Sequence, residues 1–295
     1  MTQGQTRSGF GKTDALLFLM ALIWGVNFSV VKYGTQVFSP LAFAGLRVGI
    51  AATVLLSIAA LRSRKFPAPR EVLALIGLGV IGNGLYQLLF IEGISRTRVG
   101  NAALIVAAAP AFIAVASRLG GVEQVRRKTL AGVALSVSGV AIVLLGSTRA
   151  DTGQATLAGT TLVFGGVLCW TAFTVLLQPY AQRLDPIHLS AFTMLGGSLP
   201  MLVATPRALA ATLWGDVTAP AWAAVFYASV ISMVVAYLFW YRGLRVLGPT
   251  RTAVYGNLQP VIAIAVAWIF LHETPTAWQG IGTATIMTGL FLTRT

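Results

Sequence analysis

Residues 251–273 read RTAVYGNLQPVIAIAVAWIFLHE, and residues 99–123 read VGNAALIVAAAPAFIAVASRLGGVE. Each stretch is apolar, is long enough to span a membrane as a helix, contains a proline near its middle and ends in a glutamate. One offset of 150 positions relates the two stretches and their surroundings, because it pairs Gly93 with Gly243, Ala103 with Ala253, Pro110 with Pro260, Glu123 with Glu273, Gly132 with Gly282, Ala134 with Ala284 and Gly139 with Gly289. A constant offset over that length predicts two copies of one structural unit.

The composition is that of a membrane protein. Of 295 residues, 56% are hydrophobic and only 10% are charged, whereas soluble domains have roughly 25% charged residues. Apolar runs of spanning length are predicted at residues 15–31, 40–61, 72–95, 99–117, 129–147, 157–178, 187–204, 220–241, 252–271 and 276–293. The sequence therefore predicts an all-α membrane protein with ten transmembrane helices.

Ten helices divide into five per copy, so residues 1–150 are predicted to form the first repeat and residues 151–295 the second. Because five is odd, the second copy enters the membrane from the opposite side, and a pseudo-twofold axis in the membrane plane relates the two copies. The first two helices of each half align at an offset of 146, which pairs Trp24 with Trp170, Lys32 with Gln178 and Pro40 with Pro186. Inverted repeats around a central cavity are typical of transporters.

Lysine and arginine are unevenly distributed among the predicted loops. With the N-terminus inside, the cytoplasmic segments contain Arg7, Lys12, Arg62, Arg64, Lys65, Arg70, Arg118, Arg126, Arg127, Lys128, Arg183, Arg242, Arg245, Arg251 and Arg294. The opposite side contains Lys32, Arg96, Arg98, Arg149 and Arg207. The positive-inside rule therefore favours both termini in the cytoplasm. The net charge of +13 comes from residues that flank spans rather than from a groove, which argues against nucleic acid as a partner.

Several features together resemble a known family: Trp24-Gly25, Asn27 and Lys32 in the first helix, two inverted five-helix halves, and proline-broken helices that end at Glu123 and Glu273. The chain resembles the drug/metabolite transporter superfamily, in particular its ten-helix EamA-type exporters, among which are bacterial aromatic amino-acid exporters. The resemblance implies a multi-pass protein of the bacterial inner (plasma) membrane. It does not define the cargo, since amino acids, metabolites and drugs are exported on this scaffold.

Polar and aromatic side chains at mid-depth are the candidates for a substrate path, since lipid-facing positions are normally apolar. The predicted substrate-binding residues are Trp24, Asn27, Asn83, Tyr86, Gln87, Trp170, Phe173, Tyr237, Tyr255 and Gln259. Asn83 and Gln259 alternatively bond a neighbouring helix, and Trp240 and Tyr241 are either part of this path or interfacial anchors. Rings interleaved with neutral hydrogen-bonding groups suit a small molecule with an apolar or aromatic body and a zwitterionic end. The offset of 150 pairs Tyr255 with Ile105, Asn257 with Ala107 and Gln259 with Ala109, so the site is predicted to be asymmetric.

Four further residues have a predicted gating or structural role. Pro110 and Pro260 each remove an amide hydrogen and kink a helix, and both a static bend and a moving gate fit this pattern. Arg47 and Glu92 lie at similar depth in the second and third helices, so a structural ion pair between them is expected, and the alternative is a gating or substrate role. No carboxylate is expected at the bilayer midplane, although proton-coupled antiporters commonly use one there. The sequence therefore favours facilitated transport, or coupling through groups that it does not identify.

The sequence therefore predicts an exporter of small amphipathic metabolites, first of all aromatic and other hydrophobic amino acids, that works by alternating access. The alternative is a multidrug or other metabolite exporter. A membrane-embedded enzyme fits less well, because the sequence contains no HExxH motif, Walker loop or Cys/His cluster. A channel also fits less well, because it would ordinarily have a ring of charge or a carbonyl filter, and inverted repeats are less expected in a channel. No catalytic residue, cofactor or metal is predicted. The expected partners are a small-molecule substrate and the lipid bilayer; the oligomeric state stays open, and a monomer is compatible with the sequence.

Overall fold

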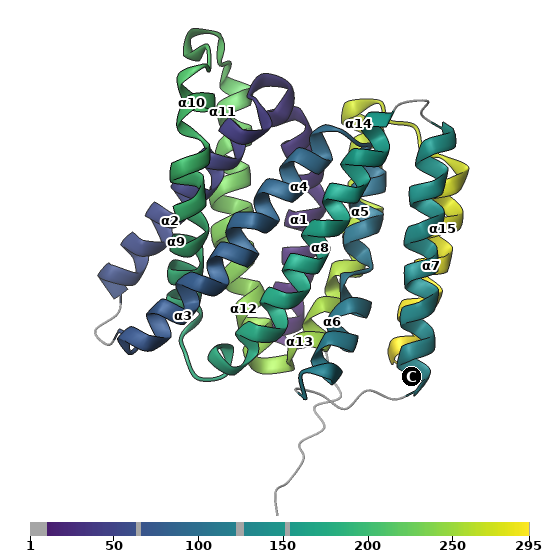
Figure 1. Ribbon diagram of the computed structural model, residues 1–295, viewed down its shortest axis with the longest axis horizontal. Helices are drawn as coiled ribbons and strands as arrows, with labels where there is room; N and C mark the ends of the chain where they lie inside the picture. Colours follow the sequence, from purple (N-terminus) through teal and green to yellow (C-terminus); the bar gives the residue numbers. More distant parts are fainter. Residues whose placement is uncertain (1–10, 63–65, 122–126, 151–153, 295) are drawn as a thin grey trace, which may run out of the picture.

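The computed structural model describes residues 11–62, 66–121, 127–150 and 154–294, and the regular structure of these residues is helical (Figure 1). The long helices run side by side between an upper and a lower end of the molecule as drawn. Glu123, which ends the first of the two related stretches, lies outside the described residues. The chain is an all-α membrane protein, as its sequence predicts.

In the first half, two helices are interrupted and three are continuous. The elements are α1 (Lys12–Val37), α2 (Pro40–Arg62), α3 (Pro69–Gly79), the π-helix η1 (Val80–Leu85), α4 (Tyr86–Ser95), α5 (Val99–Ala107), α6 (Ala109–Leu119) and α7 (Arg127–Ala150). The segments α3, η1 and α4 follow one another as a single rod, and α6 follows α5 after a break at Ala108.

The second half repeats this order and adds a small cap. Its elements are α8 (Gln154–Ala181), α9 (Pro186–Ala204), α10 (Pro206–Ala210), the 3-10 turn η2 (Trp214–Asp216), α11 (Ala219–Phe226), the π-helix η3 (Tyr227–Val235), α12 (Ala236–Leu247), α13 (Pro249–Val254), the 3-10 turn η4 (Tyr255–Leu258), α14 (Gln259–Leu271) and α15 (Ala277–Arg294). The cap, α10 with η2, stands at the upper end of the molecule (Figure 1).

Eight helical stretches of the described residues are long and apolar enough to cross a membrane: Lys12–Val37, Pro40–Arg62, Pro69–Ser95, Val99–Leu119, Leu157–Ala181, Pro186–Ala204, Ala219–Leu247 and Arg251–Leu271. They coincide with eight of the predicted spans. The other two predicted spans correspond to α7 and α15, which pack against each other at one side of the bundle (Figure 1). A count of ten membrane spans therefore stays a prediction.

Large apolar side chains cover parts of the outer surface. Leu202, Val203 and Phe270 are more than two-thirds exposed, and each belongs to a stretch of spanning length. In water these side chains would destabilise the fold, whereas in a bilayer the hydrocarbon solvates them.

Corresponding helices of the two halves make corresponding contacts. Helix α1 packs against η3, α12 and α14, and α8 packs against η1, α4 and α6. The helices α2 and α9 pack against each other, as α7 and α15 do. This arrangement brings α1, α8, α4, α12 and the two broken helices together around the centre of the bundle.

Candidate functional site

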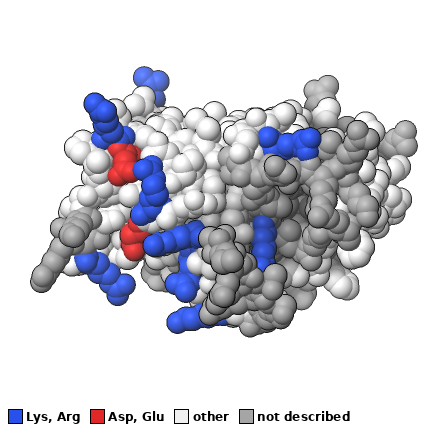
Figure 2. All heavy atoms as spheres, turned by 90° about the horizontal axis from the view of Figure 1, so that it is seen from below, with Lys and Arg blue, Asp and Glu red and all other residues white. Residues whose placement is uncertain are grey.

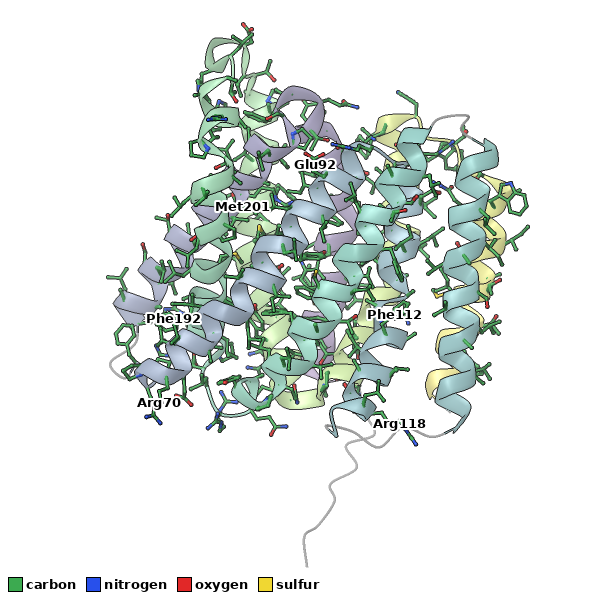
Figure 3. All side chains as sticks on the ribbon, in the orientation of Figure 1. Arg70, Glu92, Phe112, Arg118, Phe192 and Met201 are labelled. Atoms are coloured by element: carbon green, nitrogen blue, oxygen red, sulfur yellow. The ribbon has the colours of Figure 1, made fainter. Side chains whose placement is uncertain are left out.

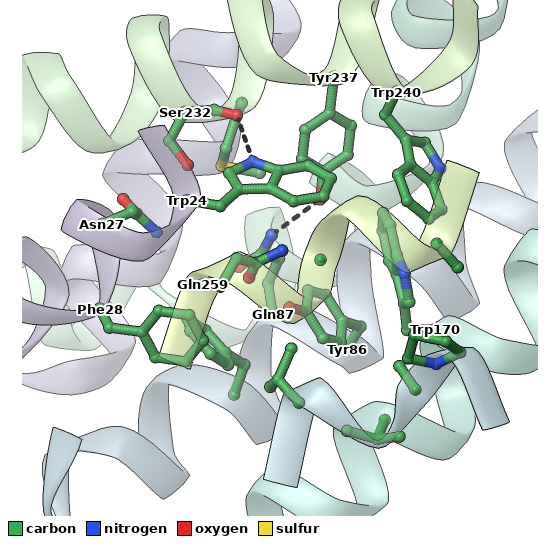
Figure 4. A pocket seen from close by; sticks show the side chains of 18 of the residues that line it. Trp24, Asn27, Phe28, Tyr86, Gln87, Trp170, Ser232, Tyr237, Trp240 and Gln259 are labelled. Carbon is green, nitrogen blue, oxygen red and sulfur yellow. Dashed lines mark hydrogen bonds between the residues drawn. The ribbon is translucent and has the colours of Figure 1, made fainter. Parts of the chain in front are cut away.

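Aromatic rings from four helices meet at the centre of the bundle (Figure 4). Trp24 of α1 lies 5.9 Å from Trp170 of α8 between ring centroids, at an interplanar angle of 85°. Tyr237 of α12 lies 5.6 Å from Trp24, and Tyr86 of α4 lies 5.2 Å from Trp170. Trp240 contacts both tryptophans, at 5.6 Å and 5.4 Å. These separations are within the range of favourable edge-to-face and tilted ring pairs, so the rings support one another in place.

The rings surround a cavity of about 60 Å³. Its lining comes from both halves of the chain: Trp24, Asn27, Phe28, Arg47, Tyr86, Gln87, Phe90, Val106, Ala109, Pro110, Ile113, Val167, Trp170, Ser232, Met233, Tyr237, Trp240, Ala253, Gly256 and Gln259. This volume is well below the roughly 300 Å³ at which pockets for drug-sized ligands begin. A cargo as large as an aromatic amino acid therefore requires the surrounding side chains and helices to move apart.

Hydrogen bonds between the two halves orient the cavity wall. Trp24 donates from Nε1 to the backbone carbonyl oxygen of Ser232 over 3.1 Å. Gln87 donates from Nε2 to the Tyr237 hydroxyl over 3.3 Å (Figure 4). Both bonds join a helix of the first half to the η3–α12 rod of the second half, so they couple the two halves directly at the cavity.

Four polar atoms of the lining are buried and form no hydrogen bond to any described residue: Asn27 Oδ1, Arg47 Nη1, Gln87 Oε1 and Trp240 Nε1. Buried polar groups in folded proteins are normally satisfied, and exceptions concentrate at functional sites. The set contains two donors and two acceptors, so it can bind a ligand that presents both kinds of group.

Both rods that supply the cavity with tyrosine contain a π-helical segment. Tyr86 and Gln87 follow η1 directly, and Ser232 and Met233 lie within η3. Shifting η1 by the repeat offset places it on residues 230–235, inside η3. Wider π-turns leave part of the backbone less constrained and are frequent at functional sites.

The two proline-containing helices break beside the cavity. Pro110 and Pro260 each occupy one of the first two positions of a new helical segment, α6 and α14. Before Pro110 the break is confined to Ala108, whereas before Pro260 the chain forms the 3-10 turn η4. The predicted breaks are therefore present in both halves, because proline cannot continue the hydrogen-bond ladder of the preceding turn.

Comparison with known proteins bears on what this cavity does. The model of the EamA-like transporter family matches the chain twice, over residues 11–145 and 157–295. This chain belongs to the EamA-like transporter family.

Similar proteins are named as transporters, without a cargo. The uncharacterized transporter YyaM of Bacillus subtilis is 26% identical over 279 residues, which cover 93% of this chain and 91% of YyaM. The uncharacterized inner membrane transporter YedA of Escherichia coli is 28% identical over 275 residues, which cover 90% of this chain and 86% of YedA. One solved crystal structure matches with a TM-score of 0.70 at 17% identity, over 97% of this chain and 99% of that chain, which shows the same fold.

In this EamA-like transporter, the structure brings most of the predicted site residues together. Those that line the cavity are Trp24, Asn27, Tyr86, Gln87, Trp170, Tyr237 and Gln259, and two residues predicted as structural, Pro110 and Arg47, line it as well. Pro260 is buried directly beside Gln259 but is outside the lining.

Three predicted binding residues lie elsewhere. Asn83 packs closely against Gly197 of α9, since a Cβ added to this glycine would lie 2.5 Å from the Cβ of Asn83. Phe173 packs against Trp170 in a tilted arrangement, and its ring occupies the space where a Cβ on Gly82 would lie. Tyr255 donates a hydrogen bond from its hydroxyl to Asp14 at the start of α1.

The expected ion pair between Arg47 and Glu92 is wrong. Glu92 lies at the upper end of the molecule and pairs with Arg96 over 2.7 Å, one helical turn away (Figure 3). Arg47 is 1% exposed, and its Nε donates to the backbone carbonyl oxygen of Ala228 over 3.4 Å. Similar depth was the basis of the prediction, but Arg47 faces the interior of the bundle, whereas the side chain of Glu92 is partly exposed.

The prediction omitted Phe28 and Ser232, whereas Trp240, which it left as either part of the path or an interfacial anchor, lines the cavity. Phe28 lies one turn after Trp24, and Trp240 lies three residues after Tyr237, so helical spacing from a predicted residue was the signal for both. Trp240 is 2% exposed, which contradicts its interpretation as an interfacial anchor.

Proposed function

We propose that this EamA-like transporter exports small amphipathic metabolites, with aromatic and other hydrophobic amino acids as its first cargo, by alternating access of the central cavity. The observation that carries the proposal is the lining itself, in which aromatic rings alternate with neutral amide groups such as Asn27, Gln87 and Gln259. Ring contacts, each worth roughly 0.5–1.5 kcal/mol, bind an aromatic side chain without strong selection among similar ones.

Contacts between repeat-related residues support an inverted arrangement of the halves. The offset of 146 relates Trp24 to Trp170, and the offset of 150 relates Gln87 to Tyr237. Both pairs are in contact in the cavity wall. Residues related by a twofold axis touch only where they lie close to that axis, so a pseudo-twofold axis through the cavity accounts for both contacts.

The proposed orientation has the lower end in the cytoplasm. That end contains the start of α1, the end of α15 and the start of α3, where Arg70 lies, as well as the end of α6, where Arg118 lies (Figures 1 and 3). Seen from below, its described surface shows many Lys and Arg side chains and few acidic ones (Figure 2). The positive-inside rule then supports the proposal that both termini are cytoplasmic, with the protein in the inner membrane of a bacterial cell.

Energy coupling through a cavity carboxylate is not part of this proposal. Among the described residues, no Asp or Glu lines the cavity. Asp14, Glu71 and Glu92 lie near helix ends, where each has an arginine within 4 Å. We therefore expect the concentration gradient of the cargo, rather than protons, to drive its export, and the cargo to leave chemically unchanged.

Reconstitution tests the proposal. Purified protein in liposomes loaded with unlabelled L-phenylalanine should accumulate labelled L-phenylalanine by counterflow, equally with and without a pH gradient. Unlabelled L-tryptophan should compete. If neither amino acid is transported or competes while the lipophilic cation tetraphenylphosphonium is transported, the amino-acid proposal is wrong and a multidrug exporter is the better account. Uptake that never saturates would indicate a channel.

A further inference from the structure

Arg47 is the charged residue of the cavity. It is 1% exposed, and among the described residues it is the only member of the lining with a charged side chain. Its guanidinium lies 5.8 Å from the centre of the Phe43 ring, and its Nε makes the long bond to the Ala228 carbonyl oxygen. Nη1 forms no hydrogen bond to any described residue. A buried cation thus has the N–H groups of Nη1 unused.

No acidic side chain among the described residues balances the charge of Arg47. The described acidic residues lie at or near the ends of helices. Asp14, Glu71 and Glu92 form ion pairs with Arg251, Arg183 and Arg96 respectively. Asp185 accepts a hydrogen bond from the Ile187 amide, Glu273 accepts one from the Val99 amide, and Asp216 lies in η2. An isolated buried charge is strongly unfavourable, so such a residue is retained where a ligand supplies the opposite charge. A guanidinium matches a carboxylate best, since two parallel N–H groups can bind its two oxygens.

The rest of the lining fits the same ligand. Trp240 Nε1 is a further buried donor without a hydrogen bond to any described residue, and Asn27 Oδ1 and Gln87 Oε1 are unused acceptors, suited to an ammonium group. The donors include a full positive charge, but the acceptors are neutral. Recognition of the carboxylate is therefore the stronger of the two interactions.

We propose that Arg47 binds the carboxylate of the cargo, so that the site takes aromatic carboxylates with or without an α-ammonium group and rejects aromatic amines. This inference rests on the proposed function and narrows it to one chemical class. A carboxylate without an ammonium group leaves as a net anion. A membrane potential of 100 mV, negative inside, then favours its export by about 50-fold, without any proton.

Three ligands with one ring test the inference: L-phenylalanine, 3-phenylpropionate, which lacks the ammonium group, and phenethylamine, which lacks the carboxylate. Binding to the purified protein is measured by quenching of tryptophan fluorescence, since three tryptophans line the cavity. We expect 3-phenylpropionate to displace L-phenylalanine with an affinity within about tenfold of it, and phenethylamine to bind at least tenfold more weakly. Displacement by phenethylamine alone would overturn the inference.

Variants add an independent readout. Arg47→Gln should weaken binding of both carboxylates by about 10- to 100-fold, and Arg47→Lys should weaken it less. The matched control Arg96→Gln, at an exposed arginine paired with Glu92, should leave binding unchanged. Without ligand, Arg47→Gln should melt at the same or a higher temperature than the parent, because it removes an unbalanced buried charge; a purely structural arginine would lower that temperature.

The two proposals fail separately. If L-phenylalanine is transported, 3-phenylpropionate does not bind, and Arg47→Gln binds L-phenylalanine normally, the role of Arg47 is wrong and the proposed function stands. If 3-phenylpropionate binds through Arg47 and is transported while L-phenylalanine is not, the role of Arg47 stands and the amino-acid proposal is wrong. If Arg47→Gln does not fold, the ligand series on the parent protein still decides.

Discussion

The two broken helices differ although they occupy equivalent places. The break between α5 and α6 is a single residue, Ala108, and the residues that line the cavity beside it are apolar: Val106, Ala109 and Pro110. The break between α13 and α14 is the four-residue turn η4, and Gly256 and Gln259 line the cavity there. The offset of 150 pairs Gln259 with Ala109. The repeat thus provides the architecture, and divergence between its copies provides the chemistry of an asymmetric site.

The approach of α1 to the second break gives the largest expected effect. A Cβ added to Gly25 would lie 2.7 Å from Ile262 Cβ and 3.3 Å from the Gln259 carbonyl oxygen, so only glycine fits here. At the equivalent position in α8 the chain has Thr171. Gly25→Val should lower the free energy of unfolding by about 1–3 kcal/mol and the melting temperature by about 3–10 °C, and it should abolish counterflow of L-phenylalanine.

Gly49→Val in α2 is the control for this substitution, because an added Cβ there meets no atom of the described chain within 4 Å. Normal melting and counterflow are expected for the control. If Gly25→Val were as active as the control, α14 would not depend on close contact with α1, and the second break would not be positioned as described.

Replacement of each proline by alanine gives the second-largest expected effect. Pro260→Ala allows α14 to extend backward into the four-residue turn η4, which would displace Gln259. Pro110→Ala allows α6 to extend backward by only one residue, Ala108, so the expected change in the backbone is smaller. We expect the initial transport rate to fall about tenfold for Pro260→Ala and about threefold for Pro110→Ala, with both proteins present at parental levels in the membrane. Equal losses would show that the two breaks serve one mechanical role, and unchanged rates would remove that role.

The smallest expected effect concerns the polar group that distinguishes the breaks. Gln259→Ala removes a neutral hydrogen-bonding group from the cavity and should reduce kcat/KM for L-phenylalanine about 3- to 10-fold, as loss of one ordinary hydrogen bond does. Ala109→Ser, which adds a small polar group at the equivalent position of the first break, should change kcat/KM less than twofold. A reversed order of these effects would mean that the first break, not the second, contacts the cargo.

The positions of the helices could be predicted from the sequence, because the repeat offset and the prolines report backbone features directly. Which side chains face the cavity could not, and the irregular turns explain why. In a regular α-helix, Asn83 and Gln87 would share a face at one turn's spacing. The π-helix η1 spans residues 80–85 and changes this phase, so Asn83 meets Gly197 while Gln87 faces the cavity.

The same reasoning applies to Tyr255 and Gln259. Four residues apart, they would also share one face of an α-helix, but η4 has three residues per turn. Tyr255 therefore turns toward Asp14, and Gln259 toward the cavity. Neither irregular turn has a sequence signature comparable to that of proline.

The claim that this cavity is the substrate path is tested most directly by the accessibility of one cysteine. Gly256 lines the cavity, and the nearest atom that an added Cβ would meet is Gln259 Nε2 at 3.3 Å. Because that atom is at the end of a flexible side chain, Gly256→Cys should fit. The variant is made in a Cys169→Ser background, which removes the only native cysteine. The matched control is Val261→Cys, which is 58% exposed on the outer face of α14. A membrane-impermeant maleimide should label Cys at 256 from each side of the membrane, and L-phenylalanine should slow that labelling, whereas Cys at 261, which faces the hydrocarbon, should not be labelled. Labelling at 256 that L-phenylalanine leaves unchanged, or that never occurs from either side, would contradict the account.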